Sequence, residues 1–156
     1  MEKTNITIRR ATAGDIPALC ALEEECFSLP WSERSFSDFF ALPYTVAYIA
    51  SVKAETGNAV CGYAGMYALS GDGDITNIAV SEKFRRQGIG SALLCALGRY
   101  AGVNRLLLEV RASNIAARAL YEKYGFKTDC IRRGFYSHPP EDAILMSLNV
   151  TGRKEC

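Results

Sequence analysis

A short loop with two glycines, residues 85–90 (RRQGIG), separates an apolar strand-like run at residues 75–80 from a helix-like run at residues 91–97. Glycine has no Cβ atom, so the backbone of such a loop can approach a ligand closely. The N–H groups at the start of the following helix, together with the helix dipole, favour an anion at the same place. This order of strand, glycine loop and helix therefore predicts a fold built around a phosphate-bearing ligand.

The form of the loop narrows the choice of ligand. The chain contains neither the Gly-x-x-x-x-Gly-Lys-Ser/Thr pattern of a Walker loop nor the Gly-x-Gly-x-x-Gly pattern of a dinucleotide fold. From these six residues alone, a flexible loop that only caps a helix is an equally good interpretation.

A single carboxylate interrupts a second apolar run, Leu106–Val110. Desolvation makes a carboxylate more basic, and Glu109 has Leu108 and Val110 as neighbours, so we expect it to be a candidate general base. In the alternative interpretation, Glu109 lies at a strand end and only pairs with a surface arginine.

Tyr121 is the second candidate for chemistry. With Ala117, Leu120 and Tyr124 it forms the i, i+3, i+4, i+7 pattern of a helix face directed at the core. In one interpretation it is a core aromatic, and in the other its hydroxyl points into a cleft, where it is a candidate for chemistry. Both interpretations can hold together, because the ring can pack while the hydroxyl lies at the edge of the core.

Apolar periodicity predicts an α/β chain with a mixed sheet of about six to seven strands and about four helices. The strand–helix–strand unit from Ile75 to Val110 requires a right-handed crossover, which makes its two strands parallel, and ligands of such sheets lie beyond the carboxyl ends of the strands. Asn77, a poor strand former, is expected to mark an irregularity. We expect strands at residues 4–10, 44–52, 59–69, 75–80, 105–110, 126–133 and 143–149, and helices at residues 12–27, 32–42, 88–100 and 114–124.

Composition sets limits on the class of protein. A chain of 156 residues with 49% hydrophobic content can form one domain, here predicted over residues 1–156. The net charge of +1 indicates neither bulk nucleic-acid binding nor membrane binding. The start, MEKTN, is polar, and no apolar run approaches the ~18 residues that span a bilayer, so we expect a cytoplasmic protein. The six cysteines lack Cys-x-x-Cys spacing and a neighbouring histidine, so we expect no metal site.

The Arg-x-x-Gly-x-Gly form of the loop resembles the acetyl-CoA pyrophosphate loop of the GNAT N-acetyltransferases. Further segments resemble the bacterial ribosomal-protein-alanine N-acetyltransferases of that superfamily: residues 30–36 (PWSERSF), 108–114 (LEVRASN) with 119–126 (ALYEKYGF), and 132–136 (RRGFY) with 141–146 (EDAILM). The resemblance covers residues 6–148. It implies the GNAT fold, in which two parallel central strands splay apart and present unpaired backbone groups to the pantetheine arm of the cofactor.

The resemblance also implies roles for individual residues. Glu109 falls on the family's general base, acting directly or through a water molecule, and Tyr121 falls on its general acid. Acetyl-CoA is implied as the co-substrate. Contacts with it are implied for Ile78, Ala79, Val80, Arg85, Arg86, Gln87, Gly88, Ile89, Gly90, Ser91 and Asn114.

The implied acceptor is the N-terminal α-amine of a protein, in particular the N-terminal alanine of a small-subunit ribosomal protein. Amine chemistry agrees with this, because an α-amine of pKa near 7.8 is about 10–20% neutral at pH 7, whereas a lysine near 10.4 is neutral about once in 2,500. We expect the apolar loops at residues 29–31 and 135–140 to wall a peptide groove, with Trp31 and Tyr136 as substrate-binding residues, although Trp31 fits the core equally well.

Other functions stay open at this point. They are a lysine or broader N-terminal acetyltransferase, a small-molecule amine acetyltransferase, and an acetyl-CoA-binding module with little turnover. The presence of both Glu109 and Tyr121 argues against the binding module, and the peptide-type loops argue against a small-molecule acceptor. A monomer is compatible with the sequence, which does not define the oligomeric state.

Overall fold

The computed structural model describes residues 5–151, so the polar start of the chain and the tail after Thr151 lie outside the described residues. These described residues form four α-helices and seven strands, in agreement with the predicted numbers. The elements are β1 Ile6–Arg10, α1 Ile16–Cys26, α2 Glu33–Ala41, β2 Thr45–Ala54, β3 Gly57–Leu69, β4 Asp72–Val80, α3 Ile89–Gly98, β5 Arg105–Arg111, α4 Ile115–Tyr124, β6 Lys127–Ser137 and β7 Pro140–Asn149.

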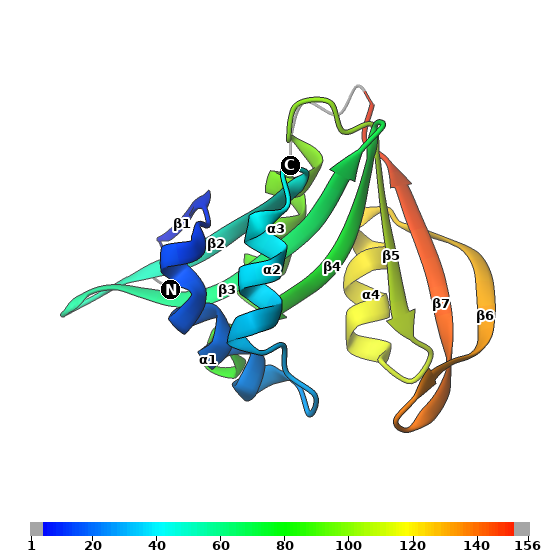
Figure 1. Cartoon of the computed structure of the whole chain (residues 1–156), viewed down its shortest axis with the longest axis horizontal. Coiled ribbons are helices and arrows are strands. Elements are labelled where there is room, and N and C mark those ends of the chain that lie inside the picture. Colours follow the sequence, from blue (N-terminus) through cyan, green and yellow to red (C-terminus); the bar gives the residue numbers. More distant parts are fainter. Residues whose placement is uncertain (1–4, 152–156) are drawn as a thin grey trace.

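The strands form one mixed sheet in the order β1-β2-β3-β4-β5-β7-β6, with helices on both faces (Figure 1). Helices α1 and α2 pack on one face, here called the α1 side, where Leu19 and Phe36 join a core with Tyr63 of β3. Helices α3 and α4 pack on the opposite face, the α3 side, where Leu93 and Tyr121 join a larger core. The predicted α/β fold with a mixed sheet is confirmed.

The two parallel strands β4 and β5 separate soon after they meet. Their pairing covers only Asp72–Asp74 with Arg105–Leu107. Beyond this point β4 pairs with β3 alone and β5 with β7 alone, and Figure 1 shows the two strands diverging toward their carboxyl ends. The later part of β4 therefore presents an edge without a strand partner, in the middle of the sheet.

A β-bulge lies in β4 where the strands diverge. In the pairing with β3, Gly65 faces Asn77 and Met66 faces Ile75, so Thr76 has no partner in the register. The bulge turns both Thr76 and Asn77 to the α1 side, since Thr76 lies against Trp31 and Phe39 and Asn77 bonds to helix α1. Bulges typically re-aim side chains in this way. The irregularity predicted at Asn77 thus lies one residue earlier, at Thr76.

The predicted loop at residues 135–140 is wrong, because β6 extends to Ser137 and β7 begins at Pro140. Two adjacent prolines indicated a loop, since proline cannot donate a ladder hydrogen bond. At the first position of a strand, however, the missing N–H is tolerated, and Pro140 still pairs with Ser137. Only His138 and Pro139 form the turn.

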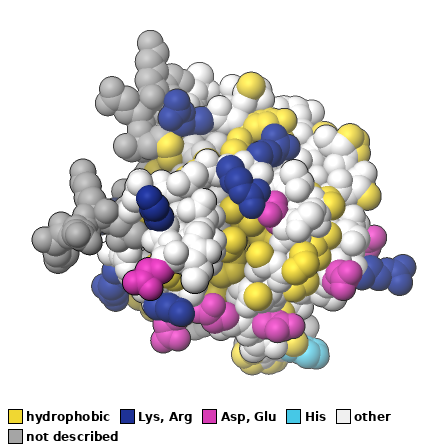
Figure 2. Space-filling model, turned by 90° about the vertical axis from the view of Figure 1, so that its left-hand side faces the viewer, with side chains coloured by type: hydrophobic (Ala, Val, Ile, Leu, Met, Phe, Trp, Pro, Cys, Tyr) yellow, Lys and Arg dark blue, Asp and Glu magenta, His cyan; other side chains and the backbone are white. Residues whose placement is uncertain are grey.

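Within residues 5–151, no helix is long and apolar enough to cross a membrane. Figure 2 shows the face that lies on the side of β1, where side chains of both charge signs surround a band of apolar ones. The balanced charge of the whole chain is therefore also seen locally on this face.

Candidate active site

The glycine loop lies at the carboxyl end of β4 and leads into α3. Gly88 is the N-cap of α3 with a left-handed backbone (φ 83°), and Arg86 is also left-handed (φ 63°). The first helical bond runs from Ala92 N–H to the Gly88 carbonyl. The N–H groups of Ile89, Gly90 and Ser91 therefore have no acceptor within the helix and can bind an anion.

Gly88 and Gly90 are required at their positions for different structural reasons. A Cβ on Gly88 would meet no atom within 4 Å, so its positive φ is what requires glycine. A Cβ on Gly90 would lie 2.9 Å from Cδ2 of Leu120 in α4. Gly90 therefore allows α3 and α4 to pack closely. This packing is sufficient to explain a glycine at position 90, without the expected close approach of a ligand.

Side chains of the loop turn back toward the protein. Arg85 donates from Nε to the Val80 carbonyl (3.0 Å), and its Nη2 lies 3.8 Å from the sulfur of Cys26. Gln87 donates to the Lys83 carbonyl (3.5 Å), and the Ile89 side chain is buried. The groups that this loop offers to a ligand are therefore mainly backbone N–H groups.

Residues 78–80 form the end of the unpaired edge of β4. Ile78 and Val80 direct their side chains to the α3 side and Ala79 to the α1 side. Because β5 diverges from β4 after Asp74, the backbone groups of residues 78–80 that point toward β5 have no strand partner. This is the place where the family resemblance implied contacts with the acetyl and pantetheine portion of acetyl-CoA.

The expected burial of Glu109 is wrong. Side chains alternate along a strand, so Leu108 and Val110 enter the α3-side core while Glu109 points to the α1 side. Its side chain is 34% exposed and pairs with Arg132 of β6, at 3.3 Å between Arg132 Nη1 and Glu109 Oε1. The open setting arises because α1 and α2 do not reach β5 and β7 (Figure 1). Glu109 is thus a solvent-accessible carboxylate beside the divergence of β4 and β5.

Tyr121 is buried, with 6% of the residue exposed, and its ring packs on Phe126 at 5.7 Å between centroids. Burial, and secondarily the proximity of Tyr136, raises the pKa of the Tyr121 hydroxyl. The phenol is therefore protonated at neutral pH, as a proton donor must be. The predicted packing of the ring is confirmed.

Arg111 fastens the β6–β7 hairpin, which carries Tyr136, to the end of β5. Its Nη1 donates to the Pro139 carbonyl and its Nη2 to the His138 carbonyl, both at 3.1 Å. Burial and the nearby Glu109 raise the pKa of Tyr136, while Arg111 opposes this shift. Tyr136 therefore lies within electrostatic range of both catalytic candidates, Glu109 and Tyr121.

Glu141 secures the same hairpin from β7. Its carboxylate pairs with Arg111 (3.4 Å) and accepts the backbone N–H of Ser113. The Ser113 bond and Arg111 lower the pKa of the Glu141 carboxyl, which therefore stays ionised at neutral pH.

Asn114, which follows Ser113 in the chain, is the N-cap of α4, and its Oδ1 accepts a hydrogen bond from the Ala117 N–H at 3.2 Å. The structure thus gives Asn114 a capping role in addition to the predicted cofactor contact.

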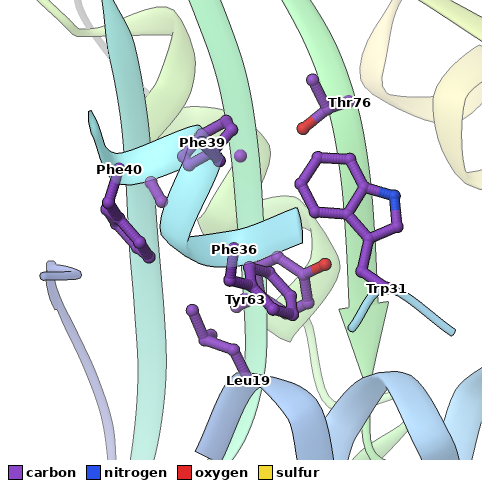
Figure 3. Close-up of a pocket in the computed structure, with 9 residues that line it drawn as sticks. Leu19, Trp31, Phe36, Phe39, Phe40, Tyr63 and Thr76 are labelled. Atoms are coloured by element: carbon purple, nitrogen blue, oxygen red, sulfur yellow. The ribbon is translucent and has the colours of Figure 1, made fainter. Parts of the chain in front are cut away.

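Trp31 lies on the α1 side, in the connection between α1 and α2. Its ring packs on Phe36 (5.3 Å) and Phe39 (6.0 Å), and Figure 3 shows it beside Thr76 at the edge of an apolar recess. The side chain is half-buried. Trp31 therefore serves the core of the α1 side and also lines the recess beside Thr76.

Sequence reasoning missed Glu23, which is 1% exposed. Its carboxylate accepts hydrogen bonds from the Tyr63 hydroxyl (2.9 Å), the Trp31 N–H (2.9 Å) and the Asn77 amide (3.2 Å). A signal was available, because position 23 follows Leu19 by four residues on the apolar face of α1. A run of three glutamates, as at residues 23–25, is however more typical of a solvated surface.

Among residues 5–151, no three His, Cys, Asp or Glu side chains are grouped so as to hold a metal ion. The chain matches the model of the acetyltransferase (GNAT) family over residues 16–126. It is 37% identical over 150 residues to the ribosomal protein bS18-alanine N-acetyltransferase of Escherichia coli K12, covering 93% of this chain and 98% of the relative.

Solved structures agree with the sequence match. The crystal structure of the ribosomal-protein-S18-alanine N-acetyltransferase from Escherichia coli superposes with a TM-score of 0.81 at 34% identity, covering 97% of this chain and 99% of that one. A GNAT family acetyltransferase from Elizabethkingia anophelis with acetyl-CoA bound superposes with a TM-score of 0.73 at 28% identity, covering 93% and 98%.

Proposed function

This chain belongs to the acetyltransferase (GNAT) family, and from that premise we propose that it transfers an acetyl group from acetyl-CoA to the N-terminal α-amine of a protein. The proposed acceptor is the N-terminal alanine of a small-subunit ribosomal protein. The observation that carries this proposal is the position of Glu109, which faces open space on the α1 side next to the point where β4 leaves β5.

The residues present fit acetyl-CoA. The N–H groups of Ile89, Gly90 and Ser91 suit its pyrophosphate, and the left-handed Gly88 leaves the space in front of the loop free of a side chain. The unpaired edge of β4 at residues 78–80 suits the amide groups of a pantetheine arm. When bound, acetyl-CoA supplies an activated acetyl thioester.

In the proposed reaction Glu109 accepts a proton from the substrate ammonium, directly or through a water molecule. Its exposure leaves room for an amine, and Arg132 holds the carboxylate toward the hairpin that carries Tyr136. The neutral amine attacks the thioester carbon, the C–S bond breaks, and Tyr121, which keeps its proton at neutral pH, donates it to the departing thiolate of CoA. The acylated nitrogen gives up its remaining extra proton, which restores the Tyr121 hydroxyl. A backbone N–H at residues 78–80 polarises the thioester carbonyl.

The amine class follows from the same chemistry. About 10–20% of an α-amine is neutral at pH 7, so a single exposed carboxylate suffices to remove the proton from the remainder. A lysine amine is almost fully protonated at this pH and needs a stronger base. The walls on the acceptor side, Trp31 and Tyr136, belong to the α1–α2 connection and the β6–β7 hairpin. Two separated walls suit an extended peptide better than a compact small amine.

A peptide panel tests this proposal. The purified protein is incubated with acetyl-CoA, and thiol release is followed with a peptide that starts Ala-Arg and with the same peptide blocked at its N-terminus and carrying a lysine. We expect release only with the free N-terminus. Release only with the blocked peptide, or only with small amines, would replace the proposal by the corresponding alternative, and binding of acetyl-CoA without release would indicate a binding module.

A further inference from the structure

The carboxylate of Glu23 joins helix α1 to three other segments on the α1 side. It belongs to α1, and its partners are Tyr63 of β3, Asn77 of β4 and the backbone of Trp31. All three donors are uncharged. A buried carboxylate is stable only when its oxygens are satisfied in this way, so the four groups constrain one another.

The connection between α1 and α2 depends on this carboxylate. Within the described part of the chain, the bond from Trp31 N–H to Glu23 Oε1 is the one hydrogen bond that residues 28–31 make. Leu29 of the same segment is 68% exposed. Without Glu23, the backbone that carries the Trp31 ring would be held by apolar contacts alone.

The bulge in β4 depends on it as well. Asn77 donates from Nδ2 to Glu23, whereas its buried Oδ1 has no partner among residues 5–151. The orientation of this amide is therefore fixed through Glu23. Asn77 projects on the α1 side, the same side of the sheet as Trp31 and Glu109.

Tyr63 completes the arrangement. It is 2% exposed, its ring packs on Phe36, and its hydroxyl donates to Glu23 Oε2. Burial, and secondarily the charge of Glu23, raises the pKa of Tyr63, so the hydroxyl stays protonated and remains a donor. The recess beside Trp31 in Figure 3 is lined by Tyr63 and Thr76. Through the hydrogen bond of Tyr63, one wall of this recess is held by Glu23.

We propose that Glu23 is a positioning residue for the acceptor substrate: its carboxylate holds Trp31 and the β4 bulge in the arrangement that binds a peptide N-terminus. This proposal rests on the proposed function. Glu23 lies on the α1 side, whereas α3, whose N-terminus is proposed to bind pyrophosphate, packs on the opposite face of the sheet. The Michaelis constant for the peptide should therefore depend on Glu23, and that for acetyl-CoA should not.

The test compares Glu23→Ala, Glu23→Gln and Tyr63→Phe with the wild-type protein. Steady-state kinetics give separate KM values for an Ala-Arg peptide and for acetyl-CoA. Trp31 is the only tryptophan of the chain, so its emission reports directly on the held segment. Asp15→Asn is the matched control, since it removes an ion pair with Arg9 (2.7 Å) next to the first turn of the same helix, far from Trp31 along the chain.

We expect Glu23→Ala to raise the peptide KM about tenfold or more and to shift Trp31 emission to longer wavelength, with the KM for acetyl-CoA within twofold. Glu23→Gln keeps an oxygen for the Trp31 N–H and should recover most of both effects. Tyr63→Phe should give a smaller change in the same direction, and it serves as the deciding variant if Glu23→Ala does not fold. The control should lower the melting temperature without moving either readout.

A folded Glu23→Ala protein with wild-type peptide KM and wild-type Trp31 emission would overturn the proposal, as would an equal rise in both KM values. Failure of the proposed function looks different. In that case the wild-type protein would acetylate no α-amine, and the emission of Trp31 would still report whether Glu23 holds the segment.

Discussion

The guanidinium of Arg111 lies over the ring of Tyr136, with 4.1 Å between Arg111 Cζ and the ring centroid. The same guanidinium donates to two carbonyls of the β6–β7 turn, at His138 and Pro139. Arg111 follows Glu109 by two residues on β5, so both side chains project on the α1 side. The wall that carries Tyr136 is therefore fixed to the strand that carries the proposed base.

Arg111→Ala should weaken peptide binding while leaving acetyl-CoA binding nearly unchanged. Loss of the cation–π contact and of the carbonyl bonds amounts to about 1–2 kcal/mol, or about five- to thirtyfold in the peptide KM. Arg133→Gln is the control, because Arg133 is 84% exposed and its ion pair with Asp142 is long, at 3.7 Å. Equal effects of the two substitutions on the peptide KM would show that Arg111 has no specific role in peptide binding.

Gly88→Val should weaken acetyl-CoA binding strongly, because valine strains the left-handed backbone that begins α3. Gly88→Asn is the informative companion, since asparagine tolerates this conformation and a Cβ there meets no neighbouring atom. Calorimetry with CoA should rank the affinities as glycine, then asparagine, then valine. Unchanged affinity of Gly88→Val for CoA would contradict the assignment of this loop.

Glu109→Gln should lower turnover by about 10²-fold or more with little change in CoA affinity, since it removes a proton acceptor and keeps the shape of the site. Part of the loss should return above pH 8, where an α-amine is already neutral. Arg132→Gln removes the same ion pair but keeps the carboxylate, so it should be more active than Glu109→Gln. Wild-type turnover of Glu109→Gln at pH 7 would make Glu109 a surface ion-pair residue only.

Tyr121→Phe should stay folded, bind acetyl-CoA and lose about 10²-fold in turnover, the usual scale for one general acid. Because burial raises the pKa of Tyr121 above the ordinary tyrosine value near 10, the donor stays protonated and the loss should be constant from pH 7 to pH 9. The melting temperature, measured in parallel, separates chemistry from packing on Phe126. A fall in stability with full turnover would leave the hydroxyl without a catalytic role.

The order of elements and the strand divergence followed from local patterns and from the resemblance, because periodicity and turn residues report on the backbone. Ser32, for example, begins α2 as a cap, with Oγ accepting the Ser35 N–H. Tertiary relationships did not follow. Gly90 is explained by Leu120, thirty residues later, and no local pattern contains that contact.

The surroundings of the candidate site were harder to predict than its residues. Glu109 was expected to be buried because its sequence neighbours are apolar, but the exposure of a strand residue depends on what covers its face. Glu23 was not singled out, because a glutamate within a run of three is typical of a solvated surface, whereas here three donors satisfy its buried carboxylate. Both errors arise because burial is a property of packing.

The most direct test of the account is the position of the acetyl group on a peptide that offers both kinds of amine. The wild-type protein is incubated at pH 7 with acetyl-CoA and a peptide that starts Ala-Arg and contains an internal lysine, and tandem mass spectrometry locates the added acetyl group. The account predicts acetylation of the α-amine, lost in Glu109→Gln. Acetylation confined to the lysine, or acetylation of the α-amine that persists unchanged in Glu109→Gln, would contradict it.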